Sequence, residues 1–489
     1  MCIKFDFRIL LSNKFSILME VTSFVILNAT SKHSTMNSKL LLITTILFIV
    51  FLTIHCNDSP KRPSMVDDLA EGVKAKTINN HFADFCGLFK VPEGTTETFK
   101  LPQDYPTTYD VNEPKPWTEV DFKSDYKAYM KTLLAYCMEG NVEVDFKVQN
   151  NKVRQWYCTP WMDNDGNQPG VAQNTGRECL HGLTREITIP IGELHPDQVK
   201  NYQTYAIAFY NEPGGYAIGQ VWADPLNPKP ALGDFPEGTV SFKLLFTEAD
   251  PNHVPFIANS KKWTANIFHP YDENKVRTNH DVRLVQLDVS VKDSRAQTGW
   301  VYGTFVHDGA GSGATWLDRM VPVGVSFGHD SDNSSMLNTN DKINSTLKQS
   351  IINAELLVPD GKVTPANRAF VRHLGQGGRM NGPVDNPISS CMSCHAFAAV
   401  TPDGHPAKIA NFGKEYTLKD FNQFFGDRRC GTHTFFQNDD NGKPIEYTAT
   451  DFSFQISNGI RNYYNLKRMK ENPDSEPHHL PTRTGHKGH

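Results

Sequence analysis

The residues with the clearest chemical meaning are two cysteines and a histidine in the sequence Cys391-Met-Ser-Cys394-His395. Two thiols separated by two residues and followed at once by an imidazole form the spacing that attaches a haem covalently. With 9 Cys and 18 His in 489 residues, this pattern arises by chance about 0.006 times per chain if residues are independent. The sequence therefore predicts one haem c, with Cys391 and Cys394 as its attachment points and His395 as the proximal iron ligand.

Three other interpretations of the cysteine pair remain open at this point. The pair could form a structural disulfide, act as a redox-active dithiol, or supply half of a zinc site. A zinc site needs a second pair of ligands nearby, and Cys430 and His433 are spaced like a knuckle that would provide it.

The sixth position of a bound iron decides what a haem can do. A methionine or histidine there suits electron transfer, whereas an open position suits binding or turnover of a small oxidant. The candidate side chains near the motif in sequence are His373, Met380, His405, His433 and Met469. Their spacing does not select one of them. We expect Arg368 or Arg379 to pair with the haem propionates, because guanidinium groups bind carboxylates in a bidentate manner.

A second group of polar side chains follows a segment rich in aromatic residues. It consists of Arg177, Glu178, His181 and Arg185. They are candidates for a pocket wall that carries ligands or acid–base groups. A salt-bridged loop packed on aromatic rings is the alternative, and it is favoured because charge pairs are far commoner than active sites.

The N-terminal segment predicts export. The stretch from Leu40 to Ile54 is almost continuously apolar and too short for a comfortable transmembrane span, which is typical of a secretion signal, and Met36 would start a signal of normal length. Cys56 follows it and resembles a bacterial lipoprotein cleavage site, although His55 stands where a small residue is usual. We expect a lipid-anchored protein on the periplasmic side or in the outer membrane.

Export has two consequences for the cysteines. Covalent haem attachment is completed outside the bacterial cytoplasm, so the leader and the haem motif support each other. Disulfides persist in that compartment. Cys158 and Cys179 bracket a loop rich in Gly, Asn and Pro, and we expect them to form a bridge.

The composition favours a globular, loop-rich β protein. Hydrophobic residues make up 39% and charged residues 21% of the chain, which also contains 34 Gly and 30 Pro. A formal net charge of -5 over 489 residues gives no electrostatic reason to expect nucleic acid as a partner. The expected partners are a redox protein and the membrane that holds the anchor.

The hydrophobic pattern predicts an α+β fold that is mainly antiparallel β. Apolar periodicity predicts helices over residues 64–85, 121–140, 341–357, 417–425 and 451–469. β-branched and aromatic runs predict strands over residues 142–148, 186–191, 204–210, 216–222, 239–246, 282–291 and 300–307. Strands without intervening helices imply a sandwich or barrel-like body. A small helical c-type haem segment is expected at its C-terminal end, with the last predicted helix packed near the haem.

These patterns divide the chain into five parts. We expect a leader with the signal and lipoprotein segment over 1–56, a tether with N-terminal helices over 57–141 and a β-rich body over 142–358. A cytochrome c-like haem segment would follow over 359–475, and a flexible His-containing tail over 476–489.

Several longer blocks resemble those of a large family of exported bacterial proteins described as cytochrome c-like. The blocks are Pro160-Trp161-Met162, Gly176-Arg-Glu178, His181-Gly-Leu-Thr184, Phe209-Tyr-Asn-Glu-Pro-Gly-Gly-Tyr-Ala-Ile-Gly-Gln-Val-Trp222, Phe235-Pro-Glu-Gly-Thr-Val240, Thr298-Gly-Trp-Val-Tyr-Gly-Thr-Phe305 and Asn381-Gly-Pro-Val-Asp-Asn386. The resemblance covers about residues 150–400 and implies a β-rich body joined to one c-type haem. It implies no activity. It places the blocks around His181 and Trp222 at a shared site.

Three functions are consistent with these observations. The first is an exported c-type haem protein that transfers electrons. The second is a haem-dependent oxidoreductase whose substrate pocket lies on the β body. The third is a surface binding lipoprotein without haem, in which Cys391 and Cys394 form a disulfide.

Overall fold

The computed structural model describes residues 92–162, 177–268, 277–357, 371–409, 415–426, 428–429, 431–439 and 441–472. All of them belong to one compact unit. Several predictions concern residues outside these ranges: the start at Met36, the signal, Cys56, the helix over 64–85, Arg368, Cys430 and the tail.

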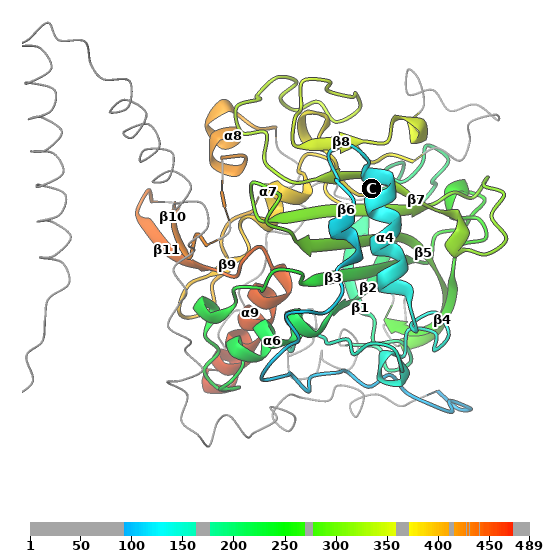
Figure 1. The fold of residues 1–489 in the computed structure, drawn as a ribbon, viewed down its shortest axis with the longest axis horizontal. Helices are drawn as coiled ribbons and strands as arrows, with labels where there is room; N and C mark the ends of the chain where they lie inside the picture. Colours follow the sequence, from blue (N-terminus) through cyan, green and yellow to red (C-terminus); the bar gives the residue numbers. More distant parts are fainter. Residues whose placement is uncertain are drawn as a thin grey trace, which may run out of the picture. The chain divides into compact units, whose positions relative to one another are not determined.

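An antiparallel sheet of eight strands dominates the described chain (Figure 1). Its strands are β1 (Thr184–Ile189), β2 (Tyr202–Tyr210), β3 (Val240–Thr247), β4 (Lys262–Phe268), β5 (Arg277–Lys292), β6 (Trp300–His307), β7 (Met320–Ser326) and β8 (Ser350–Ile352). Their spatial order is β1-β2-β3-β5-β6-β7-β8, and β4 pairs with β5 off this path. The sheet confirms the coarse prediction of a mixed fold in which antiparallel β structure prevails.

A smaller sheet and five helices complete the described elements. The small sheet has the order β10-β11-β9, with β9 (Ala399–Val400), β10 (Thr434–Asn438) and β11 (Pro444–Ala449). The helices are α4 (Tyr126–Met138), α6 (Glu212–Val221), α7 (Cys391–His395), α8 (Leu418–Phe424) and α9 (Phe454–Glu471). Short 3-10 helices lie at Pro116–Glu119, Val148–Asn150, Pro230–Leu232, Pro255–Ile257, Leu317–Arg319, Ala354–Leu356 and Gln376–Gly378. No helix in the described ranges has both the length and the hydropathy needed to cross a membrane.

The large sheet separates two hydrophobic cores because alternate side chains of a strand point to opposite faces. On β3, Phe242 and Leu244 face the core that includes Leu133 of α4, and α4 lies across this side of the sheet in Figure 1. Leu245 faces the opposite core, which also includes Ile456 of α9. The second core contains the segment with the two motif cysteines.

Three predicted helices are confirmed, and each has a local reason to begin where it does. At α4 the Asp125 carboxylate accepts a hydrogen bond from Ala128 N at 3.0 Å. At α8 Thr417 forms a capping box with Asp420, and at α9 Ser453 accepts from Ile456 N. Such side-chain caps satisfy backbone donors that have no partner in the first turn of a helix.

Two predicted elements are wrong in type. Residues 216–221 belong to helix α6 and not to a strand, and Trp222 is its C-cap; Pro213 lies in the first turn of the helix, and Gly215 allows a close approach to the Tyr157 ring. Residues 341–357 are not a helix; they contain β8 and a 3-10 turn. Asn344 accepts from Thr346 N at 3.1 Å, and such local side-chain bonds compete with helical ones.

One predicted strand is absent from the sheet. Residues 142–148 form turns, in which Asp145 and Phe146 adopt positive φ values of 51° and 58°. Trp263 Nε1 donates to Asp145 Oδ1 at 2.9 Å, and Phe146 is buried in the core that includes α4. Phe146 is therefore buried from a turn, and the alternating apolar residues of this segment do not indicate a strand.

Candidate functional site

The two motif cysteines and the histidine lie on α7, a short helix fixed by its own N-terminus. Ser390 Oγ accepts from Ser393 N at 3.2 Å, and Ser393 Oγ accepts from Ser390 N at 2.8 Å. This capping box orders the first turn. Residues three apart share a helix face, so Cys391 and Cys394 are presented together.

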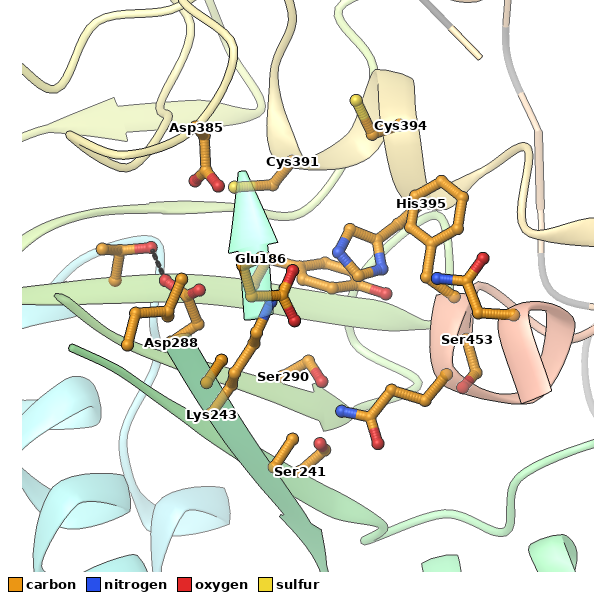
Figure 2. Close-up of a pocket in the computed structure, with 18 of the residues that line it drawn as sticks. Glu186, Ser241, Lys243, Asp288, Ser290, Asp385, Cys391, Cys394, His395 and Ser453 are labelled. Atoms are coloured by element: carbon orange, nitrogen blue, oxygen red, sulfur yellow. Dashed lines mark hydrogen bonds and ion pairs between the residues drawn. The ribbon is translucent and has the colours of Figure 1, made fainter. Parts of the chain in front are cut away.

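A cavity of about 280 Å³ lies between α7 and the face of the large sheet that α4 does not cover. Cys391, Cys394 and His395 all line it, and Figure 2 shows them above the polar floor formed by the strands. Other wall residues come from the loop before α7, from the first turns of α9 and from the segments that contain Met162, Arg177 and Ile409. The motif therefore faces a partly open cavity of the protein.

The His395 ring is held in one orientation by backbone and by aromatic neighbours. His395 Nδ1 lies 2.8 Å from Phe452 O, so Nδ1 carries the proton and donates it to that carbonyl. The ring packs against Tyr302 at 4.6 Å and Phe454 at 5.1 Å between centroids. Burial lowers the pKa of His395 to about 4. Nε2 of the neutral ring is left with a lone pair, the form that binds a metal.

The carbonyl that orients His395 belongs to a turn with unusual backbone geometry. Asp451 and Phe452 have φ values of 43° and 67°, a region that L-residues with side chains avoid at a cost of roughly 1–3 kcal/mol. The Asp451 carboxylate accepts from Lys292 Nζ at 2.6 Å, Trp300 Nε1 at 3.2 Å and Phe235 N at 2.9 Å. These buried bonds tie the turn to the sheet.

The floor of the cavity carries charged and hydroxyl side chains from neighbouring strands. One row crosses the sheet in direct register, with Ala208 opposite Lys243, Lys243 opposite Asp288, and Asp288 opposite Thr304. Lys243 Nζ lies 3.4 Å from Glu186 Oε2 of β1. Burial alone would lower the pKa of Lys243, but the carboxylates of Glu186, Asp288 and Asp385 outweigh it and raise that pKa. Lys243 is therefore a fixed cation on the floor.

Two carboxyl groups of the cavity are joined through one amide. Gln286 Nε2 donates to Asp288 at 2.8 and 3.0 Å and to Asp385 Oδ2 at 3.1 Å. Thr304 Oγ1 donates to Asp288 Oδ1 at 2.7 Å, and Gly382 N donates to Asp385 Oδ2 at 3.0 Å. Burial, and next the charge of Asp385, raise the pKa of Asp288 to about 7. A carboxyl group on this floor therefore titrates near neutrality.

Both motif cysteines are free thiols. Cys391 Sγ lies 4.0 Å from Met380 Sδ. Burial raises the pKa of Cys391 well above its ordinary value and that of Cys394 to about 11. Both sulfurs are thus protonated at neutral pH, which suppresses their reaction as thiolates.

The four residues predicted to form a pocket wall, Arg177, Glu178, His181 and Arg185, do not all lie at the cavity. Arg177 lines the cavity and donates to Gly182 O. Glu178 instead accepts from His181 N at 2.7 Å, and the His181 ring stacks on Trp263 at 4.4 Å. Neither they nor Arg185 are among the residues of the cavity wall. Glu178 and His181 fit the interpretation as a salt-bridged loop packed on an aromatic ring.

Four of the five predicted sixth ligands can be located, and none is part of the cavity wall. His373 Nδ1 bonds Val371 O at 3.1 Å, His405 pairs with Asp403 at 3.1 Å, and His433 lies 3.5 Å from Asp234. Met380 is fully buried beside Cys391. Met469 lies in α9, and its side chain is outside the described part of the structure.

The cavity wall contains one methionine, Met162, that sequence reasoning did not select as a ligand. Met162 is the last residue of the block Pro160-Trp161-Met162, and that block was the sequence feature that could have identified it. The charged floor was missed as well. Its signal was Lys243 within an otherwise apolar strand, together with the alternation of Gln286, Asp288 and Ser290 along β5.

Arg379 has a structural role that differs from the expected pairing with propionates. Its guanidinium donates to His329 O at 3.1 Å, Asp330 O at 2.8 Å and Asn333 O at 2.9 Å. It also stacks on Phe425 at 4.8 Å and is not part of the cavity wall. The alternative, Arg368, lies outside the described residues.

The expected bridge between Cys158 and Cys179 is not present, because both residues are buried free thiols. Cys158 Sγ donates to Ala208 O at 3.4 Å. The segment from Phe99 to Pro102 bonds both residues at opposite ends: Phe99 N donates to Cys179 O, and Cys158 N donates to Pro102 O, each at 2.8 Å. The two cysteines are therefore held at separate points along the same segment.

Within the described ranges, no group of three or more His, Cys, Asp and Glu side chains is arranged to hold a metal ion. Comparison of the chain with protein-family models, with curated proteins and with solved structures found no match.

Proposed function

We propose that the protein is a c-type haem protein in which Cys391 and Cys394 hold the porphyrin covalently and His395 binds the iron. The observation that carries the proposal is the bond from His395 Nδ1 to Phe452 O at 2.8 Å. Histidine ligands of metals almost always donate their other ring N–H in this way. It leaves Nε2 available on a ring that lines the same cavity as both thiols.

The side chains of the cavity suit a porphyrin. Its volume of about 280 Å³ lies just below the range of small-molecule sites, roughly 300–1,000 Å³, and the cavity is partly open. Val384, Ile409 and Phe454 give it apolar surfaces, and Arg177 adds a cation to the wall, a group that pairs with carboxylates such as propionates. When bound, the haem supplies one-electron chemistry.

Electron transfer is the first candidate activity. Cys391, Cys394 and the fixed ring of His395 would hold a haem at three points, and a rigidly held haem suits an electron carrier. Under this proposal residues 359–475 form a haem segment resting on a sandwich-like β body. The protein is exported, anchored by a lipid on Cys56, and exchanges electrons with a redox partner protein. The resemblance of the longer blocks to cytochrome c-like proteins is part of the same proposal.

A haem-dependent oxidoreductase is the second candidate, favoured by the polar floor. Lys243, Glu186 and Asp288 face the cavity, and such convergent polar groups are typical of sites that orient a substrate. The two candidates differ in the sixth position of the iron. Rapid binding of cyanide or carbon monoxide by the purified protein supports the oxidoreductase, and resistance to both supports the carrier.

The proposal is tested by the spectrum of the protein made in a host competent in cytochrome c maturation. His395→Ala should keep a covalent haem signal but lose the wild-type low-spin bands, because the proximal ligand is gone. His373→Ala is the matched control, since burial lowers the pKa of that histidine to about 4 as well but it is not on the cavity wall. Identical spectra for His395→Ala and wild type contradict the assignment of His395. A colourless wild-type protein favours the binding lipoprotein without haem.

A further inference from the structure

The charged floor of the cavity has a composition that the attachment of a haem does not require. It combines one cation, Lys243, with the carboxyl groups of Glu186 and Asp288, and the loop before α7 adds a third carboxyl group, that of Asp385. Lys243 is paired with Glu186 at 3.4 Å. The carboxyl groups of Asp288 and Asp385 are therefore in excess over the cations of this floor.

Asp288 and Asp385 are arranged as a pair and not as two separate anions. Both lie within hydrogen-bond distance of the same nitrogen, Gln286 Nε2. Gln286 is fully buried and is itself fixed, because its Oε1 accepts from Val384 N at 3.1 Å. A side chain at Gly382 would collide with the Gln286 amide. Two carboxylates held close together in a buried site disfavour double ionisation, so one proton is retained more easily.

The surroundings of the pair come from every element packed against it. Lys243 on β3 and Glu186 on β1 are the charged neighbours on the floor, and Cys391, Cys394 and His395 on α7 are the titratable neighbours above it. Thr304 on β6 supplies a hydroxyl donor at 2.7 Å. The α9 residues on the wall, Ser453, Gln455 and Asn458, are uncharged. The charge of this compartment is therefore adjusted most easily by a proton on the pair.

We propose that Asp288 and Asp385 form a proton-binding site that takes up one proton from solvent when the haem of the cavity is reduced. The inference rests on the proposed function. One electron arrives from a one-electron donor protein, and one proton moves from water to Asp288 Oδ2, the oxygen of that carboxylate that does not accept from Thr304. Oxidation releases both again. The charge of the cavity is the same before and after, so a buried charge is never left uncompensated.

Because reduction and protonation are thermodynamically linked, the proposal predicts the size of a shift in the midpoint potential. If reduction favours protonation, protonation must raise the midpoint potential by the same free energy. For one proton per electron, each tenfold change in proton concentration shifts the potential by up to about 59 mV. The raised pKa of Asp288, about 7, places this dependence around neutral pH.

The test is spectroelectrochemical titration of the holoprotein between about pH 5 and 9. The wild-type potential should fall as pH rises through neutrality, and Asp288→Asn and Asp385→Asn should flatten this region. Asp281→Asn is the control, because Asp281 lies on the same strand but is more than half exposed and pairs with Lys262. A wild-type potential independent of pH, or a pH dependence that persists in both pair variants, overturns the inference.

A second measurement needs no variant to fold. The reduced-minus-oxidised infrared difference spectrum of the wild-type protein should contain a positive C=O band of a protonated carboxyl group near neutral pH. Its absence overturns the inference. The two proposals fail differently: a denatured protein without covalent haem overturns both, whereas covalent haem without the proton-linked signals overturns the proton site alone.

Discussion

At the scale of single residues, the site depends on one buried aspartate outside the motif. Asp451 fixes the turn whose next carbonyl, Phe452 O, accepts from His395. The side chains of Lys292 and Asp451 are only 11% and 2% exposed. Removing one partner of a buried pair leaves the other charge without compensation, which typically costs about 3–5 kcal/mol.

Asp451→Ala should therefore lower the free energy of unfolding by about 3 kcal/mol. The matched control is Glu355→Ala, because the pair of Glu355 with Lys127 at 2.7 Å is 76% and 46% exposed. Exposed pairs contribute about 0–1 kcal/mol. Denaturant titration of the two variants checks the difference. Equal losses of stability would show that the turn is not held by this pair.

Asp288 should make the stability of the haem-free protein depend on pH. Burial raises its pKa in the folded state to about 7, above the ordinary value near 4. The folded state thus binds more protons than the unfolded state between these values, and its contribution to stability is lost as pH rises from about 4 to about 7.

The contribution of Asp288 to the free energy of unfolding should fall by at most about 1.4 kcal/mol per pH unit. Unfolding titrations of a Cys391→Ala, Cys394→Ala protein at several pH values should show this fall. Adding Asp288→Asn should remove it, and adding Asp281→Asn should not. A fall of the same size in the Asp288→Asn background would mean that another group titrates.

At the scale of elements, a side-chain cap made a helix predictable only where an apolar periodicity followed it; the five-residue helix α7 has a capping box at Ser390 but is too short to show one. Asp125, Thr417 and Ser453 mark the starts of α4, α8 and α9, and these helices were expected. No side-chain hydrogen bond caps α6 at Asn211, and its short apolar run gives a period that suits a strand equally well. The close packing of Gly215 in α6 against the Tyr157 ring favours the helix in the folded protein.

The cap of α7 should matter for the haem and not only for stability. Ser390→Ala removes the capping box and should cost about 1 kcal/mol. Thr417→Ala removes the capping box of α8 at a similar cost and serves as the control. The low-spin bands should change in Ser390→Ala alone, because α7 carries the thiols and His395. Equal effects of both variants on the haem spectrum would show that the cap of α7 stabilises the protein in general and has no specific effect on the haem.

At the scale of the whole molecule, the large sheet has a hydrophobic core on each face, and the second core adjoins a cavity with a charged floor. The motif on α7 could be predicted because its chemistry depends on local spacing. The floor could not, because Lys243, Asp288 and Thr304 come together through cross-strand register. Glu186 of β1, which is separated from β3 by β2, lies 3.4 Å from Lys243. Pairing order, which a single sequence does not reveal, determined that part of the site.

A bound haem should stabilise the whole unit. A group that binds the folded state alone raises the stability of that state, and here it also fills a cavity of about 280 Å³. The melting temperature of the Cys391→Ala, Cys394→Ala protein, freed of haem, should be several degrees below that of the holoprotein. Identical melting curves would place the haem outside the folded core.

The central claim is the covalent haem, and the most direct test is the intact mass of the denatured protein made in a maturation-competent host. After extraction with acidified organic solvent, the wild-type chain should retain the mass of one haem. The Cys391→Ala, Cys394→Ala chain should have the mass of the polypeptide alone. A wild-type chain with only the polypeptide mass, at normal yield of folded protein, would contradict the assignment of Cys391, Cys394 and His395 as a haem site.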